Sequence, residues 1–225
     1  MNPIIVALDF DSAAGARELV DKLGNQVSFY KVGLELYAAA GMEFVRELTA
    51  KGKDVFLDLK LYDIGETVKR AVARIAASGV RFTTVHGSRT VMRAAAEGKG
   101  ASGLKLLAVT VLTSFDQDDL ADLGYPSSVS DLVALRVRKA VESGIDGIVC
   151  SPLELAVVRE IAGPRAILVT PGVRSAGAAQ GDQKRVATPS EALANGANYL
   201  VIGRQITRAG DPAAEARRIL EEIGW

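Results

Sequence analysis

The stretch DVFLDLKLYDIGETVKRAVARIAASGVRFTTVHG, residues 54–87, decides the fold because it contains one complete strand–helix–strand unit. Two short apolar runs, DVFLDLK (54–60) and RFTTVHG (81–87), have the length and composition of strands. Between them, from Thr67 to Ala77, Ala and other apolar residues recur at helical spacing. Gly79 can adopt the left-handed conformation that ends a helix. A helical crossover of this kind makes the two strands parallel.

The same unit repeats along the whole chain. The other predicted strands are PIIVALD (3–9), SFYKVGL (28–34), KLLAVTVLT (105–113), DGIVCS (146–151), AILVTPGV (166–173) and NYLVIG (198–203). Further helical patterns include Ala13 to Leu23, Leu132 to Glu142 and Pro212 to Ile223. Eight units in 225 residues predict an α/β fold, a (β/α)8 barrel in a single domain over residues 1–225. An open doubly wound sheet is the alternative.

The composition excludes several classes of protein. The 27 Lys and Arg balance the 27 Asp and Glu, so no surplus positive charge favours nucleic acid as a partner. A single cysteine, Cys150, forbids an internal disulfide, and a single histidine, His86, leaves little room for zinc sites. No apolar run approaches the roughly 18 residues of a membrane span, and no targeting segment is recognisable. We therefore expect a cytoplasmic protein without a membrane or nucleic-acid partner.

Chemically useful residues gather where the predicted strands end. Active sites of (β/α)8 barrels lie at the carboxyl ends of the strands. These ends carry Asp9, Lys31, Asp58, Lys60, His86, Thr113, Ser151, Pro171, Gly203 and Arg204. Strands that serve packing alone have no use for charges there, so this end of the barrel is the expected site.

Asp58 and Lys60 form the strongest single feature. Strand side chains alternate, so both point to one face, which we expect to be the barrel interior because the leucines between them suit the layer under the helices. Burying an ionised Asp and Lys requires further partners, and Asp9 and Lys31 are the natural ones. We therefore expect an alternating array of two carboxylates and two ammonium groups. The alternative is an ion-pair network that only closes the barrel top.

The loops after the seventh and eighth strands predict a phosphate site. Thr170-Pro171-Gly172-Val173-Arg174 is followed by a small polar loop and by Gln183-Lys184-Arg185, and the last strand ends in Gly203-Arg204 before a helix. In this fold these two loops commonly bind phosphate. Arginine supplies fork-shaped donors and glycine permits close backbone approach. The alternative for Gly203-Arg204 alone is a helix start with a solvated arginine.

Two motif-like patterns are expected to be structural. Residues 98–103 spell GxGxxG, but they follow a helix rather than a strand, so we expect a turn. Four aspartates between Asp116 and Asp122 lack the glycine and terminal glutamate of a calcium loop. We expect them in the first turns of a short solvated helix.

The run Asp58-Leu-Lys60-Leu-Tyr-Asp63-Ile64-Gly-Glu-Thr67 resembles the signature DxKxxD[IV]xxT of the orotidine 5′-monophosphate decarboxylase family. The resemblance covers nearly the whole chain. Gly65 stands where many members have Pro or Ala, which concerns the start of the helix rather than the chemistry. The other matching motifs, in order, are ALDF around Asp9, FYKVG around Lys31, LTS at Thr113, TPGVR at Arg174, GDQKR at Gln183 and VIGR at Arg204.

This resemblance implies a homodimeric enzyme without cofactor or metal that converts orotidine 5′-monophosphate to uridine 5′-monophosphate and carbon dioxide, the last step of UMP biosynthesis. It implies that Lys60 protonates carbon 6 of the pyrimidine and that Asp58 lies beside the substrate carboxylate. The implied catalytic residues are Lys60, Asp58, Asp63 and Lys31.

The same resemblance assigns the substrate contacts. Strand geometry alone leaves Asp63 as a helix N-cap or a first-turn acid, whereas the resemblance implies that Asp63, Ile64 and Thr67 enter the active site of the other subunit. Pro171 also belongs to the implied substrate-binding set. The remaining contacts implied are Asp9, Lys31 and Thr67 for the ribose hydroxyls, Thr113 and Ser114 near the base, and Arg174, Gln183, Gly203 and Arg204 for the phosphate.

Two other functions stay open on the sequence. Magnesium-dependent sugar-phosphate decarboxylases or aldolases of the same superfamily share DxKxxD, but they have an acidic metal ligand at the end of the second strand, where this chain has Lys31. A barrel that binds a phosphorylated ligand for regulation would keep Arg174 and Arg204 without needing Lys60.

Overall fold

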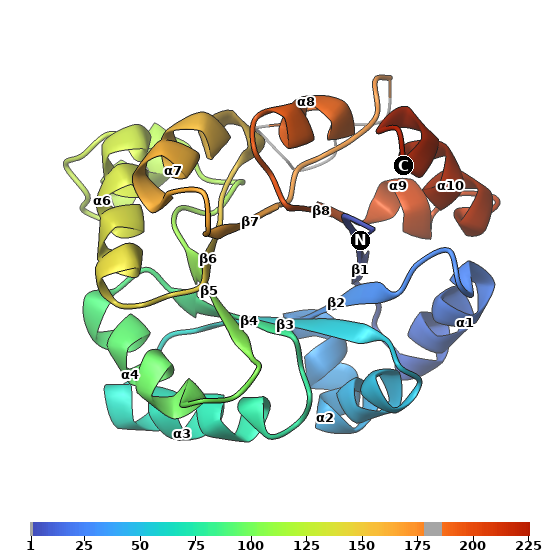
Figure 1. Cartoon of the computed structure of the whole chain (residues 1–225), viewed down its shortest axis with the longest axis horizontal. Coiled ribbons are helices and arrows are strands. Elements are labelled where there is room, and N and C mark those ends of the chain that lie inside the picture. Colours follow the sequence, from blue (N-terminus) through green and yellow to red (C-terminus); the bar gives the residue numbers. More distant parts are fainter. Residues whose placement is uncertain (1, 178–185) are drawn as a thin grey trace.

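Eight parallel strands close into a barrel in the computed structural model of the chain, which describes residues 2–177 and 186–225 (Figure 1). Each strand pairs with the next, and Ile5 of the first strand pairs with Val201 of the last. This closure confirms the barrel and excludes the open sheet. The strands are β1 (Ile4–Leu8), β2 (Phe29–Gly33), β3 (Asp54–Leu61), β4 (Phe82–His86), β5 (Lys105–Val109), β6 (Gly147–Val149), β7 (Ile167–Thr170) and β8 (Tyr199–Ile202).

Helices surround the barrel on the outside (Figure 1). The predicted helix from Ala13 to Leu23 has those bounds, because Ser12 accepts a hydrogen bond from the Gly15 amide at its start and Gly24, with φ 50°, ends it. The helices are α1 (Ala13–Leu23), α2 (Leu34–Ala50), α3 (Gly65–Ala76), α4 (Arg89–Lys99), α5 (Gln117–Asp122), α6 (Val129–Glu142), α7 (Leu155–Ala162), α8 (Pro189–Ala194), α9 (Arg204–Thr207) and α10 (Pro212–Glu222), with a 3₁₀ turn η1 (Pro152–Glu154).

Alternation along the strands produces two apolar layers. One layer lies between the strands and the helices and contains Leu57, with Leu59 packed against it. The second fills the barrel interior with the opposite faces of the strands, and its members are Ile5, Ala7, Phe29, Phe56, Phe82, Leu107, Val169 and Val201. Since Phe56 is an interior residue, Asp58 two positions later has the same orientation, as the sequence predicts.

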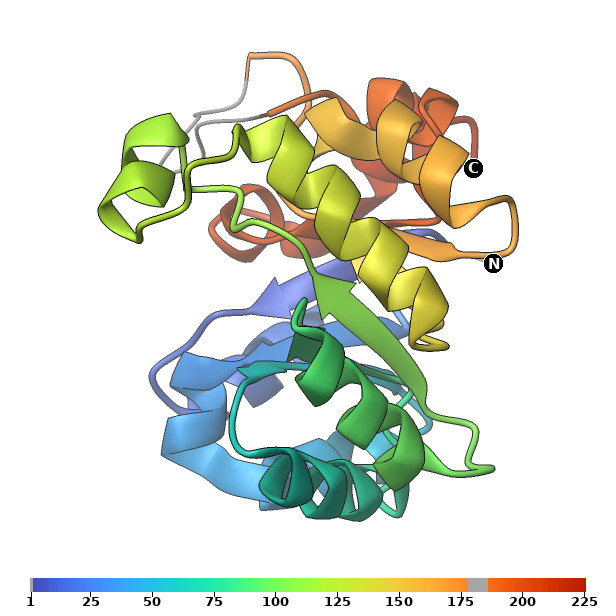
Figure 2. The same cartoon turned by 90° about the vertical axis from the view of Figure 1, so that its left-hand side faces the viewer.

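The predicted fifth strand is too long. The run from Lys105 to Thr113 is mostly apolar, but β5 ends at Val109. Val111, Leu112 and Thr113 line a cavity instead, so the apolar character of Val111 and Leu112 reflects a ligand-sized space rather than continued strand pairing. The chain then forms α5, which projects from the body of the barrel (Figure 2).

The two motif-like sequence patterns, the aspartates from Asp116 to Asp122 and the GxGxxG pattern, are structural, as expected. Asp116 caps α5 in a capping box with Asp119, so the aspartates sit in the first turns of a short helix. The GxGxxG pattern begins with the last two residues of α4, Gly98 and Lys99. Gly100 ends that helix with φ 54°, and only the rest of the pattern lies in the turn before β5. Among the described residues, no helix is long and apolar enough to cross a membrane.

Candidate active site

A cavity of about 570 Å³ opens at the carboxyl ends of the strands. Its floor is the top of the interior apolar layer, contributed by Ala7, Phe56, Val109, Val149 and Val201. Its walls carry most of the site residues predicted from the sequence: Asp9, Lys31, Asp58, Lys60, Thr113, Ser114, Pro171, Arg174, Gly203 and Arg204. Two other strand-end residues, His86 and Ser151, do not line it.

Four charged side chains form the predicted alternating chain on one wall. Lys31 Nζ lies 2.9 Å from Asp9 Oδ1 and 3.9 Å from Asp58 Oδ2, and Lys60 Nζ lies 2.9 Å from the same Asp58 oxygen. The side chains of Lys31 and Asp58 are each 12% exposed, so their interaction is weakly screened. The two ends of the chain are more exposed, Lys60 at 32% and Asp9 at 59%, and all four residues line the cavity. The site therefore presents an ammonium group held by a buried carboxylate.

A glycine makes room for the Lys31 pair. A Cβ atom at Gly33 would lie 3.0 Å from Lys31 Nζ and 3.6 Å from Asp9 Oδ1. A side chain there would force the ammonium group to move, so the small residue at the end of β2 is a steric requirement of the array.

Thr84 holds the other end of the array and was not predicted. Its buried hydroxyl donates to Asp58 Oδ1 at 2.8 Å and accepts from the Lys60 backbone amide at 2.9 Å. The sequence contained a signal, since Thr84 alternates with Phe82 and His86 and must share their face of β4.

The backbone at Lys60 is unusual. Lys60 has φ 48°, and it is the one non-glycine residue with positive φ among those the structure describes. The pairing of β3 with β4 shifts register between Leu57 and Leu61, so the bulge lies at this lysine. The left-handed conformation costs about 1–2 kcal/mol in a residue with a Cβ. Strain of this kind is concentrated at functional positions.

The loop after β5 forms a second wall and is anchored from behind by Arg136 of α6. The Arg136 guanidinium donates to the backbone carbonyl of Thr110 and, at 3.0 Å, to the hydroxyl of Tyr125. It also stacks on the Tyr125 ring, 5.3 Å from the centroid. These contacts hold both ends of the segment that carries Thr113 and Ser114. No sequence signal distinguishes Arg136 from the other charges of an amphipathic helix.

Arginines gather at the end of the cavity formed by the β7 and β8 loops. Burial first, and the positive charge of Arg204 second, lower the pKa of Arg174 from its usual value. Arg208, which was not predicted, also lines this end of the cavity. The sequence feature that pointed to Arg208 is its spacing of four residues from Arg204. The predicted Gln183 lies outside the described residues.

Asp63, Ile64 and Thr67 do not line the cavity of their own chain, and all three are exposed. Neither position that strand geometry left open for Asp63 is right: it precedes both the N-cap residue, Ile64, and the first turn of α3, and its carboxylate accepts from the adjacent Ile64 amide at 2.6 Å. Ile64 is 77% exposed and Tyr62 beside it is 69% exposed. Tyr62 and Ile64 are therefore two large apolar side chains that this short segment exposes on the surface of the chain.

His86 and Ser151 have structural surroundings. His86 stacks against Tyr62 with ring centroids 5.1 Å apart. Ser151 is buried and caps η1 by accepting from the Leu153 amide. Within residues 2–177 and 186–225, no group of three or more His, Cys, Asp or Glu side chains has the arrangement of a metal site.

The fold and the site together define a class: (β/α)8 barrels with a charged reaction centre at the strand ends and arginines after the last two strands. Residues 2–219 match the family described as Orotidine 5'-phosphate decarboxylase / HUMPS family. The chain belongs to this family.

Its relatives carry the same name. The chain is 53% identical, over 98% of its length and 94% of the relative's, to "Orotidine 5'-phosphate decarboxylase" of Rhodopseudomonas palustris. It is 51% identical, over the same shares, to the protein of that name from Methylorubrum extorquens. The solved structure of orotidine 5'-phosphate decarboxylase from Lactobacillus acidophilus superposes with a TM-score of 0.89 at 36% identity, covering all of both chains.

Proposed function

We propose that this protein is a carboxy-lyase that converts orotidine 5′-monophosphate (OMP) to uridine 5′-monophosphate (UMP) and carbon dioxide in pyrimidine biosynthesis. The observation that carries the proposal is the Asp9–Lys31–Asp58–Lys60 chain of ion pairs in one cavity with Arg174 and Arg204. A nucleotide has a reacting base at one end and a phosphate at the other. The cavity has matching groups at both ends, and the names of the relatives agree.

Lys60 is the proposed proton donor. When the bond from carbon 6 to the carboxylate breaks, carbon dioxide leaves and the electron pair stays on carbon 6 in an orbital that the ring cannot delocalise. An ammonium group next to that carbon stabilises the negative charge and then gives it a proton, which leaves neutral Lys60 to regain a proton from solvent. The 2.9 Å contact with Asp58 supports this role, because it holds the Lys60 ammonium group in a fixed position in the cavity.

Asp58 is the proposed neighbour of the substrate carboxylate. Three groups hold its side chain: Lys60, Lys31 and the Thr84 hydroxyl. A carboxylate fixed in this way cannot turn away from a second one, so the repulsion is relieved when carbon dioxide departs. Lys31 and Asp9 are the proposed ribose ligands, and Thr113, Ser114 and Pro171 the proposed contacts around the base.

The phosphate end supplies binding energy. Arg174, Gln183, Gly203 and Arg204 are the proposed phosphate ligands, and two guanidinium groups give charge-assisted hydrogen bonds to a dianion. Demanding enzymatic reactions require about 20 kcal/mol of barrier reduction, which one ammonium group cannot supply alone. Binding energy from the remote phosphate contributes the remainder by holding the base against Lys60 and Asp58.

The active enzyme is proposed to be a homodimer. Asp63, Ile64 and Thr67 reach the partner's active site in this proposal, which their exposure and their position outside their own cavity support. Asp63 would then add a carboxylate to the array from across the interface, and Thr67 a ribose contact.

The decisive experiment follows the absorbance change of OMP with purified protein in the presence of EDTA. We expect full turnover, because the proposed steps use Lys60 and its carboxylate neighbours. Activity that EDTA abolishes and Mg²⁺ restores would favour the magnesium-dependent relatives, although Lys31, paired with Asp9 and Asp58, occupies the position of their metal ligand. No turnover under either condition would refute the proposal.

A further inference from the structure

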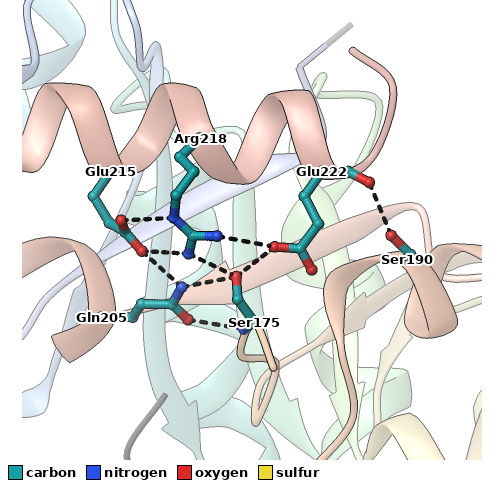
Figure 3. A network of polar contacts seen from close by, with 6 residues as sticks. All are labelled: Ser175, Ser190, Gln205, Glu215, Arg218 and Glu222. Carbon is teal, nitrogen blue, oxygen red and sulfur yellow. Dashed lines mark hydrogen bonds and ion pairs between the residues drawn. The ribbon is translucent and has the colours of Figure 1, made fainter. Parts of the chain in front are cut away.

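The residues that directly follow the two cavity arginines are joined to each other. Ser175 follows Arg174, and Gln205 follows Arg204. The Ser175 amide donates to Gln205 Oε1 at 3.1 Å, and Gln205 Nε2 donates to the Ser175 hydroxyl at 2.9 Å (Figure 3). This reciprocal pair connects the loop after β7 to the start of α9, two segments that are 30 residues apart in the sequence.

Helix α10 anchors this pair from outside the cavity. Arg218 Nη2 donates to the Ser175 hydroxyl at 3.0 Å, and that hydroxyl donates to Glu222 at 2.6 Å. Gln205 also donates to Glu215 at 2.8 Å. The Ser175 hydroxyl thus uses its one donor and both acceptor positions, and Ser175 is only 6% exposed (Figure 3).

The anchor is itself rigid. Arg218 forms a forked contact with Glu215, at 2.9 Å through Nε and 2.7 Å through Nη2. Its hydrogen bond to Arg218 lowers the pKa of the Glu215 carboxyl, and the same bond raises the pKa of Arg218, so both groups stay ionised. A polar network whose members are all satisfied resists rearrangement.

We propose that Ser175 and Arg218 are positioning residues for the phosphate: they hold Arg174 and Arg204 in the arrangement that a phosphate monoester requires. Neither Ser175 nor Arg218 lines the cavity, so each acts through the arginines. The inference rests on the proposed function of the two arginines as phosphate ligands.

The physical reason is preorganisation. Two guanidinium groups repel each other until an anion lies between them. Fixing the backbone beside both arginines removes the cost of bringing them together at each binding event. The competing explanation is that the network only attaches α10 to the barrel, in which case it affects stability and not phosphate recognition.

The test compares binding of UMP and of uridine, which differ by the phosphate alone. In Ser175→Ala and Arg218→Met, we expect the Kd for UMP to rise about tenfold and the Kd for uridine to stay within about twofold, with a matching rise in KM for OMP. Ser190→Ala is the matched control: it removes a hydrogen bond to the Glu222 backbone carbonyl of the same helix that involves neither Ser175 nor Arg218, and it should leave both affinities unchanged.

The comparison is insensitive to partial unfolding, because UMP and uridine are titrated into the same sample and only their ratio is used. Arg218 is half exposed, so its variant keeps the fold even if Ser175→Ala does not. Equal losses for UMP and uridine, or no loss of UMP affinity, would overturn the inference. Binding of UMP and uridine is measured without turnover. A protein that bound UMP but left OMP intact would refute the proposed function, and the ratio of the UMP and uridine affinities would still test this inference.

A double-mutant cycle provides a second test of whether Ser175 acts through the arginines. If Ser175 acts through the arginines, Ser175→Ala should cost no further UMP affinity in a background that already carries Arg174→Ala and Arg204→Ala. Additive losses would mean that Ser175 contributes independently of the arginines and would contradict the proposal.

Discussion

The hydroxyl of Thr84 donates a 2.8 Å hydrogen bond to the carboxylate of Asp58, and it also accepts a 2.9 Å bond from the Lys60 backbone amide. One side chain on β4 therefore holds both the buried acid of the array and the backbone of its terminal lysine. The lysine backbone is left-handed, with φ 48°, and the hydroxyl bond helps to retain that conformation.

Replacing Thr84 by Val keeps the shape of the side chain and removes only the hydroxyl. We expect kcat for OMP to fall roughly ten- to a hundredfold, because Asp58 and Lys60 lose a shared fixed point, while the Kd for UMP changes little. Steady-state kinetics and a UMP titration measure the two quantities. Thr84→Ser, which keeps the hydroxyl, is the matched control and should retain most of kcat. A valine variant with wild-type kcat would show that the hydroxyl does not position the pair.

Lys60→Ala separates chemistry from binding. Removing the ammonium group deletes both the proposed stabilising charge and the proposed proton donor, so we expect turnover of OMP to fall by at least about a thousandfold. The arginines at the other end of the cavity are untouched, so UMP should bind with a Kd within roughly tenfold of the wild-type value. Calorimetric titration and an absorbance assay measure the two effects. Substantial residual turnover would assign the proton transfer to another group.

Local sequence patterns predicted the features that depend on residues close together in the sequence. The alternation of Asp58 and Lys60 with two leucines gave their common orientation, and the repeat of strands and helices gave the closed barrel. A strand fixes side-chain direction by its period of two, so the shared orientation of Asp58 and Lys60 follows from sequence neighbours alone, whereas the barrel was inferred from the repeat over the whole chain.

Features that join distant segments were not predictable in the same way. Ser175, Gln205 and Arg218 are ordinary polar residues of a loop and two helices until the fold brings Gln205 Nε2 to 2.9 Å and Arg218 Nη2 to 3.0 Å from the Ser175 hydroxyl. The end of β5 was missed for a related reason: Val111 is buried whether it faces a helix or a ligand cavity, and periodicity cannot tell these apart.

Mixed dimers test whether Asp63 acts across an interface. Lys60→Ala and Asp63→Ala homodimers should each be inactive or nearly so. A hybrid has one site with both residues intact, so an equal mixture after subunit exchange should recover about a quarter of wild-type activity. Exchange is verified with differently tagged chains, and activity is read by OMP absorbance. If exchanged hybrids remain inactive, Asp63 acts within its own chain.

His86 predicts a stability change just below neutral pH. Burial first, then the charges of Arg136 and Lys60, lower its pKa in the folded protein below the usual 6.5, and its ring also stacks against Tyr62. Just below pH 6.5 the unfolded chain therefore binds a proton at His86, whereas the folded chain does not. The contribution of His86 to the free energy of unfolding is present above pH 6.5 and is lost as the pH falls toward the folded pKa.

Carboxylates also titrate on acidification, so the informative quantity is the difference between the wild type and His86→Phe, which keeps a stacked ring. Urea unfolding at pH 7.5 and 5.5, chosen to bracket roughly the usual histidine pKa, should show a smaller loss for His86→Phe than for wild type. Equal losses would mean that His86 is not held neutral by its surroundings.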